Sequence, residues 1–465
     1  MTVPLYTDQG DIVGRVSDAM RRHRNILLQS ATGSGKTRMA AHMIKRASDK
    51  GNAVGFMVPR RELLKQTSAT LDAFNIPHGF CAAGYVRNPF LNVHLMTSGT
   101  VARRLDTAPK LKLLFIDECH FGGAELDKII THYKAQGTWI IGLSATPMKT
   151  SGQGMGDWYD VMVEGPSVAW LIDNERLSKF RLYAPNTPDL SVVKSTAKGY
   201  VQRDLDAFMM ADDHGKVLIG NAAKHYKENA WGKLNLSFCT SVKAAELSSQ
   251  MFNDAGVPSA VLHGKMDDAE IKKVIMALAR REILNISNCA LLCFGFDLSQ
   301  ASGMDVTIES MSDLAPTKSL PWQMQKWGRV LRMKPEPALI FDHVGNHTQH
   351  EGGPDADRVW SLDGREKKKG NSEPTQPARQ CPECFMVDRP KPECGGCGFV
   401  FPVQSRTIEE VEGELQEVTG RTITPRQQQG MAKTLDDLIA HGKAKGYKNP
   451  HAWAAKIMTA RMAKR

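Results

Sequence analysis

One stretch near the start of the chain, residues 30–37, constrains the fold more than any other. It reads Ser-Ala-Thr-Gly-Ser-Gly-Lys-Thr, follows the short apolar run Asn25–Gln29 and leads into the helix-favouring run Met39–Ile44. A strand, a glycine-rich turn and a helix start are the context of a phosphate-binding loop, because glycines let successive backbone N–H groups face one point. The stretch therefore predicts that the chain binds a nucleoside triphosphate.

The residues of this loop have separate predicted tasks. Lys36 would place a compact positive charge on the outer phosphates, and the hydroxyl of Thr37 would ligate magnesium. The usual pattern begins with glycine, and here that place is taken by Ser30. The alternative is a glycine-rich loop that binds nothing, which the matching flanks disfavour. The remaining nucleotide contacts would come from Thr32, Gly33, Ser34 and Gly35.

Length and charge narrow the class of protein. A chain of 465 residues suits two or three domains, each with its own core. The net charge of +10 favours an anionic partner, with nucleic acid first, although many basic proteins bind none. The N-terminus lacks the basic start and apolar core of a signal peptide, and no run approaches bilayer length. We therefore expect a cytoplasmic protein, in which the nine cysteines are free thiols or metal ligands.

Strand and helix patterns alternate twice along the chain. The first alternation covers residues 1–177 and the second covers 178–347, which predicts an α/β fold with a parallel sheet in each half. No sequence repeat relates the halves. Strands are expected at Ile26–Leu28, Val54–Val58, Val93–Met96, Leu113–Ile116, Trp139–Leu143, Leu234–Phe238, Ser259–Leu262, Ala290–Cys293 and Ala338–Phe341. Helices are expected at Arg61–Phe74, Ala124–His132 and Val242–Ala255.

The C-terminal part divides by composition. Residues 348–380 are poor core formers and are expected to be a linker, followed by a four-cysteine segment, 381–402, and a charged helical tail, 403–465. In the tail, residues 403–420 hold one Arg against five Glu, whereas residues 421–465 hold ten Lys/Arg against two Asp. The basic segment would grip nucleic acid through charge and stacking, with Tyr447, His451 and Trp453. The alternative is a helical pair docked on the lobes with its aromatic residues buried.

Polar residues end two of the predicted strands. Asp117 would hold magnesium, and Glu118 would orient the attacking water. The hydroxyls of Ser144 and Thr146 would form a relay from the nucleotide site towards a second surface. Either pair could instead be ordinary strand-end residues, but their place after the phosphate loop favours the site.

These motifs, in this order, resemble motifs I, II and III of superfamily-two helicases. Pro59–Gln66, Met96–Arg103 and Phe238–Ser241 resemble motif Ia, the next strand-contacting motif and motif IV. Gly295-Phe296-Asp297 resembles motif V, and Gln325–Arg332 matches the Gln-x-x-Gly-Arg-x-x-Arg form of motif VI. The His of the Asp-Glu-Cys-His box and Asp342–Asn346 make the RadD-like bacterial and phage helicases the nearest in appearance.

The resemblance implies two tandem RecA-like lobes with ATP in the cleft between them. It implies that Arg329 and Arg332 stabilise charge on the γ-phosphate, that Gln9 reads the adenine, and that His120 links the ATP site to Gln325. Gly295 and Asp297 would complete the nucleotide site. Contacts with the nucleic-acid backbone are proposed for Arg60, Thr97, Thr100 and Thr240.

Two Cys-x-x-Cys pairs predict a structural zinc site, since each knuckle presents two thiolates to one ion. The alternative is a redox or disulfide pair, which a cytosolic protein disfavours. The predicted ligands are Cys381, Cys384, Cys394 and Cys397.

Together these features predict an ATP-dependent helicase or translocase that acts on nucleic acid, more on DNA than on RNA, at forks or branches. Replication or repair proteins are expected partners of the C-terminal region. The alternatives are a duplex translocase that never separates strands and a nucleotide-gated clamp on nucleic acid.

Overall fold

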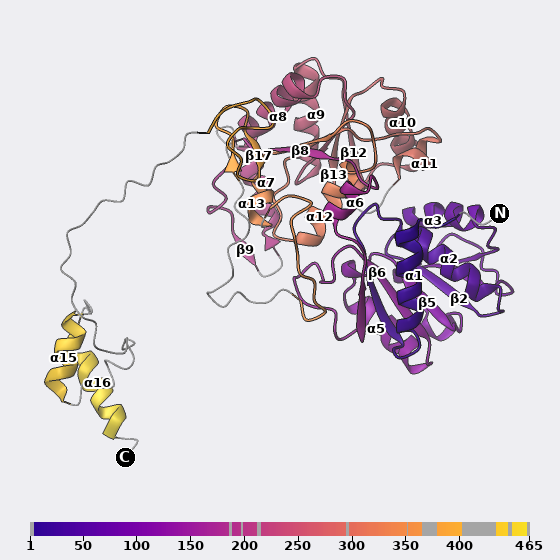
Figure 1. Cartoon of the computed structure of the whole chain (residues 1–465), viewed down its shortest axis with the longest axis horizontal. Coiled ribbons are helices and arrows are strands. Elements are labelled where there is room, and N and C mark those ends of the chain that lie inside the picture. Colours follow the sequence, from indigo (N-terminus) through magenta and orange to yellow (C-terminus); the bar gives the residue numbers. More distant parts are fainter. Residues whose placement is uncertain are drawn as a thin grey trace. The chain divides into compact units, whose positions relative to one another are not determined.

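A computed structural model describes residues 4–185, 188–196, 199–211, 215–293, 297–350, 352–364, 379–401, 434–444 and 449–462. The chain divides into two compact units, residues 1–402 and 403–465, and each is described by itself (Figure 1). The first unit holds two α/β lobes, here called lobe 1 and lobe 2, each built on one sheet.

Lobe 1 is a seven-stranded sheet in the order β3-β4-β2-β5-β6-β1-β7, with parallel pairing between all neighbours. Its strands are β1 Asn25–Gln29, β2 Val54–Val58, β3 Gly79–Cys81, β4 Val93–Thr97, β5 Leu113–Ile116, β6 Trp139–Ser144 and β7 Val161–Glu164. Its helices are α1 Thr7–Ala19, α2 Lys36–Ser48, α3 Glu62–Ala73, α4 Ser98–Ala102 and α5 Ala124–Ala135, with short 3₁₀ turns η1 Leu105–Thr107 and η2 Cys119–Phe121.

Both faces of this sheet are apolar. Along β1, Ile26 and Leu28 face the cluster formed with α1, α2 and α3, whereas Leu27 faces the cluster formed with α5. Burial on both faces explains why the five central strands, β1, β2, β4, β5 and β6, read as continuous apolar runs and could be predicted from the sequence.

Lobe 2 is an eight-stranded sheet in the order β12-β13-β11-β14-β15-β8-β17-β16. The strands are β8 Phe180–Tyr183, β11 Asn235–Phe238, β12 Ser259–His263, β13 Asn285–Cys289, β14 Ser310–Asp313, β15 Ala338–Asp342, β16 Arg379–Gln380 and β17 Met386–Asp388. The helices are α6 Val168–Asp173, which precedes the lobe, and α7 Gln202–Met210, α8 Gly215–Asn229, α9 Val242–Asp254, α10 Asp268–Ala279, α11 Leu298–Ser302, α12 Leu320–Val330 and α13 Asn346–Gln349. A small hairpin, β9 Ser195–Thr196 and β10 Gly199–Tyr200, and the 3₁₀ turn η3 Leu291–Cys293 complete it.

One face of the lobe 2 sheet carries a buried polar layer. Asn235 of β11 pairs in register with Asn285 of β13 and with Ser310 of β14, and the Nδ2 of Asn235 donates to Oδ1 of Asn285 at 2.8 Å. The Oγ of Ser287 contacts the Oγ of Ser248 in α9 at 2.9 Å, which shows that this layer lies under α9. Hydrogen bonding makes such polar burial tolerable.

This layer explains a wrong prediction. We expected a strand at Ala290–Cys293, but those residues enter the turn η3, and the strand is β13, Asn285–Cys289. The sequence of β13, Asn-Ile-Ser-Asn-Cys, is too polar to indicate a buried strand, and the apolar run after it indicates one instead. The same reason hid β14, which reads Ser-Met-Ser-Asp.

The first half of the predicted linker is not a free connector. Residues 352–364, here called the strap, pack against both lobes: Trp360 lies on the lobe 2 core and Leu362 on the lobe 1 core. The carbonyl of Leu362 accepts hydrogen bonds from the N–H groups of Met155 at 2.8 Å and Gly156 at 2.9 Å. A Cβ on Gly154 would lie 2.3 Å from that same carbonyl oxygen, so this approach requires glycine. Two apolar side chains therefore anchor a stretch whose glycine and proline content suggested a linker.

In the second unit, α15 Leu435–Ala444 and α16 Pro450–Met462 pack on each other. Leu438 and Ala454 are buried between them, and Trp453 is half-buried at their side. Tyr447 lies outside the described residues, and His451 is exposed. Of the alternative that we expected, a pair of helices docked on the lobes with its aromatic residues buried, the helical pair itself is present, with Trp453 partly buried in its small core. Docking of this pair on the lobes stays a prediction. Among the described residues, no helix has the length and apolar character needed to cross a membrane.

Candidate active site

The predicted site residues of lobe 1 follow the carboxyl ends of neighbouring parallel strands. The phosphate loop follows β1, the Ser144–Thr146 turn follows β6, and Asp117 follows β5, which are adjacent in the sheet order. Arg60 and Thr97 follow β2 and β4, farther along the same edge. In an open α/β sheet this edge is where ligands bind.

The phosphate loop depends on its glycines. Gly33 and Gly35 have φ of 87° and 88°, a left-handed conformation that favours glycine. A Cβ on Gly35 would lie 2.5 Å from Nε2 of Gln9, which instead donates to the carbonyl of Ser34 at 2.9 Å. The ammonium of Lys36 contacts the carbonyls of Ser30 and Ala31 at 3.1 and 3.3 Å. The loop is thus curled around the Lys36 side chain, and Gln9 is placed against it.

Two carboxylates sit beside this loop. Burial, and then the neighbouring charge of Glu118, raise the pKa of Asp117 to about 7, while Lys36 acts in the opposite direction. Glu118 has φ of 46°, an uncommon conformation for a residue with a side chain. Its Oε2 is buried, and no group among the described residues donates a hydrogen bond to it. The imidazole of His120 is close to it, and its Nδ1 lies 3.3 Å away. Strained, desolvated carboxylates of this kind occur at functional sites.

His120 starts a chain of hydrogen bonds. Its Nδ1 lies 2.9 Å from the Oγ of Ser144, and that Oγ donates to the carbonyl of Thr146 at 2.6 Å. Since the Ser144 proton is used there, the network assigns the ring proton to Nδ1. Burial lowers the pKa of His120 to about 4, so the ring is neutral and Nε2 is an acceptor. Among the described residues, that Nε2 has no hydrogen-bond partner.

The helix of motif VI packs directly on the phosphate loop. A Cβ on Gly328, in α12, would lie 2.4 Å from Cγ2 of Thr32, so only glycine permits this contact between the lobes. Phe121 and Trp322 make an edge-to-face contact across the same boundary, with ring centroids 5.6 Å apart. Neither aromatic residue was predicted from the sequence, since each is separated from its partner by some 200 positions.

The residues predicted in lobe 2 divide into two groups. Gln325 and Arg329 are buried in α12. Arg332 is partly exposed, and its Nη2 donates to Oδ2 of Asp297 at 3.1 Å. Asp297 also caps α11 by accepting from the backbone N–H of Gln300. Gly295 lies outside the described residues. The structure therefore buries Gln325 and Arg329 in α12, the helix whose Gly328 meets the phosphate loop, and pairs Arg332 with Asp297.

Several buried polar atoms of the predicted site have no hydrogen-bond partner in the part of the chain that the structure describes: Oγ1 of Thr32 and Thr146, Nε2 of His120 and both amide atoms of Gln325. Of these residues, Thr32 lies where the two lobes meet, against Gly328. Buried polar groups are paired almost everywhere in proteins, so unpaired atoms on these residues fit a polar ligand such as a triphosphate. The predicted magnesium ligands fit as well, because Thr37 follows Lys36 in α2 and Asp117 is an oxygen ligand of the kind that magnesium takes.

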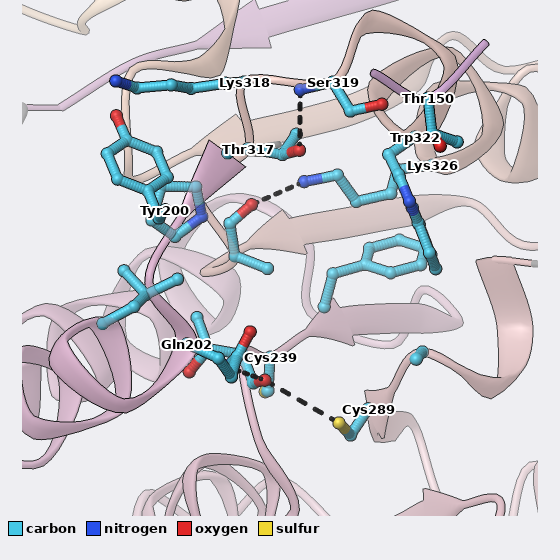
Figure 2. A pocket seen from close by; sticks show the side chains of 17 residues that line it. Thr150, Tyr200, Gln202, Cys239, Cys289, Thr317, Lys318, Ser319, Trp322 and Lys326 are labelled. Carbon is cyan, nitrogen blue, oxygen red and sulfur yellow. Dashed lines mark hydrogen bonds between the residues drawn. The ribbon is translucent and has the colours of Figure 1, made fainter. Parts of the chain in front are cut away.

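The predicted nucleic-acid contacts lie in separate places. In lobe 1, Thr97 donates to the hydroxyl of Thr100 at 2.9 Å, at the start of α4. In lobe 2, Thr240 lines a cavity of about 360 Å³ above the ends of β11, β13 and β14, together with Tyr200, Lys318 and Trp322 (Figure 2). The Oγ1 of Thr240 is buried without a partner. The cavity combines aromatic rings, a cation and hydroxyl groups, and the sequence did not predict it.

The four cysteines converge. Their sulfur atoms all lie within 4.8 Å of one another. The Sγ atoms of Cys381 and Cys397, and those of Cys384 and Cys394, are 3.6 Å apart, close to the ~3.8 Å expected between thiolates at ~2.3 Å from one tetrahedral zinc. The set fits zinc. The module is joined to lobe 2, because β17 pairs with β8.

Comparisons with known proteins agree with this geometry. Residues 2–149 match the family described as type III restriction enzyme, res subunit. A 51.5 kDa protein of a Lactococcus phage is 31% identical over 395 residues, covering 84% of this chain and 81% of that one. The putative mitochondrial ATP-dependent helicase irc3 of Schizosaccharomyces pombe is 24% identical over 59% of this chain and 47% of its own.

The fold also has a solved counterpart. The ATP-dependent type ISP restriction-modification enzyme LlaBIII, solved bound to DNA, superposes with a TM-score of 0.56 at 14% identity, over 74% of this chain. This chain spans only 28% of LlaBIII and about half of irc3. The expected pair of RecA-like lobes is confirmed, and the chain belongs to the superfamily-two helicases, a family of ATP-hydrolysing enzymes.

Proposed function

We propose that this protein is an ATP-driven motor on DNA, which couples opening and closing of the two lobes to movement along a strand at forks or branches. The observation that carries the proposal is the contact of Gly328 with Thr32, where α12 of lobe 2 meets the phosphate loop of lobe 1. A site completed by both lobes makes hydrolysis depend on closure, and alternating closure moves a bound strand.

In this proposal each group has one task. Lys36 and the loop N–H groups bind the phosphates, while Thr37 and Asp117 hold magnesium, which would neutralise phosphate charge. Glu118 orients the attacking water, and Arg329 stabilises charge that develops on the transferred phosphate. Because Nε2 of His120 is an acceptor, the amide of Gln325 would donate to it when the lobes close.

DNA is the proposed substrate because of the proteins that this chain resembles. The family match carries the name of a restriction enzyme subunit, and the LlaBIII structure contains DNA. The positive charge supports a polyanion of either kind. A hydrolysing motor is preferred over a passive clamp, because Glu118 and Arg329 are both present. Strand separation and duplex translocation both need hydrolysis, so these residues do not distinguish them.

The test measures ATP hydrolysis without polymer and with single-stranded DNA, duplex, forked DNA and RNA, with Lys36→Ala as the inactive reference. We expect forked or single-stranded DNA to stimulate the most. Equal rates with every polymer and with none would contradict the motor. Strand displacement on the fork then separates a helicase from a duplex translocase, and tight nucleotide-dependent DNA retention with slow hydrolysis would indicate the clamp.

A further inference from the structure

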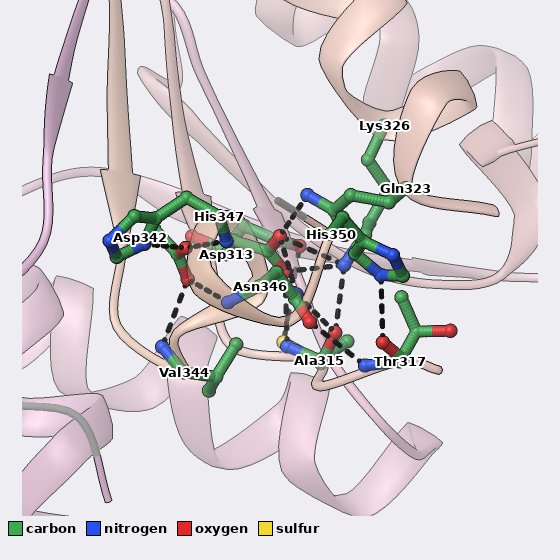
Figure 3. Close-up of polar contacts among 12 residues, drawn as sticks. Asp313, Ala315, Thr317, Gln323, Lys326, Asp342, Val344, Asn346, His347 and His350 are labelled. Carbon is green, nitrogen blue, oxygen red and sulfur yellow. Dashed lines mark hydrogen bonds and ion pairs between the residues drawn. The ribbon is translucent and has the colours of Figure 1, made fainter. Parts of the chain in front are cut away.

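A buried ion pair joins α12 to the rest of lobe 2. The Nζ of Lys326 lies 2.7 and 2.9 Å from the carboxylate oxygens of Asp313, at the end of β14, and 2.7 Å from the carbonyl of Ala315 (Figure 3). The Asp313 and Lys326 side chains are 0% and 4% exposed. An ammonium has three protons, and these acceptors use all of them.

Two amides complete the environment of this carboxylate. The Nε2 of Gln323, also in α12, and the Nδ2 of Asn346, the first residue of α13, each donate to Oδ2 of Asp313 at 2.9 Å. Asn346 also donates to the carbonyl of Ala315 at 3.0 Å and accepts from the N–H of Thr317 at 3.0 Å. One carboxylate thus holds two residues of α12, the segment before it and α13.

The strand next to β14, β15, supports this arrangement. Asp342, at the end of β15, accepts from the backbone N–H groups of Val344, Asn346 and His347, and Nδ1 of His347 lies 2.8 Å from its Oδ2. Burial raises the pKa of Asp342, but the hydrogen bond and charge of the His347 side chain, and then the backbone N–H groups of His347 and Asn346, lower it further. The charged Asp342 therefore fixes the start of α13, and with it Asn346.

Burying the charges of Asp313 and Lys326 costs free energy, so their presence indicates a role other than stability. Two charges removed from water lose hydration, and apolar residues of similar size would often stabilise a fold as well. The same helix carries Gln325, next to Lys326, and Arg329, three positions on, and its Gly328 meets the phosphate loop of lobe 1. Because α12 is one rigid helix of eleven residues, a bond at Lys326 sets the rotation and depth of Gln325 and Arg329.

We propose that Asp313, Lys326 and Asn346 are positioning residues for ATP hydrolysis, which hold α12 so that Gln325 and Arg329 meet a nucleotide bound on lobe 1. This inference rests on the proposed function. Lys326 lies inside motif VI, where a lysine would ordinarily be assigned to phosphate binding, but its ammonium is saturated by the contacts above. It acts through Arg329, not on the nucleotide.

The experiment compares Lys326→Met, Asp313→Asn and the double variant in the full-length protein. Each single variant leaves a buried group without its partner, so a loss of folded protein is expected. The double variant removes both charges, so we expect it to recover most of the melting temperature. We expect kcat for ATP to stay at least about tenfold lower in the double variant, with KM for ATP unchanged, since a ~1 Å misplacement can cost ~10²-fold.

A second measurement separates positioning from stability. Binding of ADP with aluminium fluoride, a transition-state mimic that engages the arginine, is compared with binding of ADP alone. The ratio of the two affinities should fall about tenfold in the double variant, whereas a merely structural defect would lower the amount of active protein and leave the ratio unchanged. Asn346→Ala, which keeps the ion pair, should lower kcat and the ratio less, by a few-fold.

The matched control is Arg281→Met. Arg281 forms a 2.9 Å ion pair with Glu309, at the opposite end of β14 from Asp313. The Arg281→Met variant should leave kcat and the ratio of the two affinities as in the wild type. Wild-type kcat and an unchanged ratio in the folded double variant would overturn the positioning role. If the double variant does not fold, the same result in Asn346→Ala overturns it. A wild-type protein without Lys36-dependent hydrolysis would overturn the proposed function itself.

Discussion

The two lobes share an architecture but bury different chemistry. In lobe 1 the central strands bury apolar side chains on both faces, as Leu27 and Leu28 show. In lobe 2 the strands β11, β13 and β14 bury Asn and Ser on the face that meets α9. A parallel sheet therefore does not require an apolar sequence, provided that the polar groups satisfy one another.

The lobes also differ in their polar groups at the site. Lobe 1 offers groups that bind: backbone N–H groups, Lys36 and two carboxylates. Lobe 2 offers groups on one helix, and buried hydrogen bonds fix that helix in place. Under the proposed function this difference is a division of labour, in which lobe 1 would hold the nucleotide and lobe 2 would complete its hydrolysis.

The largest expected effect tests this division directly. Arg329→Ala should lower kcat for ATP by about 10³–10⁵-fold, because a guanidinium at the transferred phosphate is worth that much where it acts, while ATP affinity stays within a few-fold of the wild type. Lys36→Ala should lower both kcat and the affinity for ATP. The measurements are steady-state hydrolysis and equilibrium nucleotide binding, with the surface variant Arg280→Ala as control. A loss of ATP affinity in Arg329→Ala would contradict the division.

Removal of a metal ion from the four-cysteine site should affect only one lobe. A strong chelator would release the two loops that carry the cysteines, one between β16 and β17 and one after β17, and the pairing of β17 with β8 should weaken with them. Hydrogen exchange is expected to rise in β8, β16 and β17 and to stay unchanged in the lobe 1 strands. Cys384→Ser should reproduce the effect, and Cys289→Ser, outside the cluster, should not. Equal changes in both lobes would mean that the metal is not local to lobe 2.

Matched core variants measure the two kinds of burial. Leu27→Ala, in the centre of lobe 1, should lower the stability of that lobe by about 2–5 kcal/mol, from lost transfer energy and the cavity left behind. Asn235→Ala, in the centre of lobe 2, should cost about 1–3 kcal/mol, because Ser310 loses its acceptor and Asn285 loses one of the two donors to its Oδ1. Thermal unfolding with lobe-resolved hydrogen exchange checks both. A negligible effect of Asn235→Ala would mean that the polar layer is not a cooperative network.

A further expected effect is on the pH dependence of stability. Burial first, and then the charge of His225, lower the pKa of His343 in lobe 2 to about 3 from 6.5. Between those values the unfolded chain takes up a proton that the folded lobe does not, so stability falls as the pH falls, by up to about 1.4 kcal/mol per pH unit. His343→Phe should flatten the melting temperature between pH 6.5 and 4. The exposed His451→Phe is the control, and an unchanged slope in His343→Phe would contradict the assignment.

How much the sequence could predict follows from the same contrast. The five central strands of lobe 1 were predicted to within a residue at each end, because burial on both faces leaves a continuous apolar run. The two edge strands, β3 and β7, were missed, since they are short and only partly buried. In lobe 2 the strand at 285–289 was displaced and the strand at 310–313 was missed, because Asn and Ser in them carry no hydrophobic signal. With β14 unrecognised, nothing pointed to Asp313 as the end of a strand.

The sequence by itself determined the local chemistry: a phosphate loop between a strand and a helix, acids at the end of a strand, and two Cys-x-x-Cys knuckles. These motifs are short, and each residue's task depends on neighbours a few positions away. Only the tertiary structure decided that Gly328 lies against Thr32, that Lys326 is used up by Asp313, and that Leu362 returns to lobe 1. Such contacts join positions far apart in the chain, and they arise from the packing of whole elements, which no local pattern encodes.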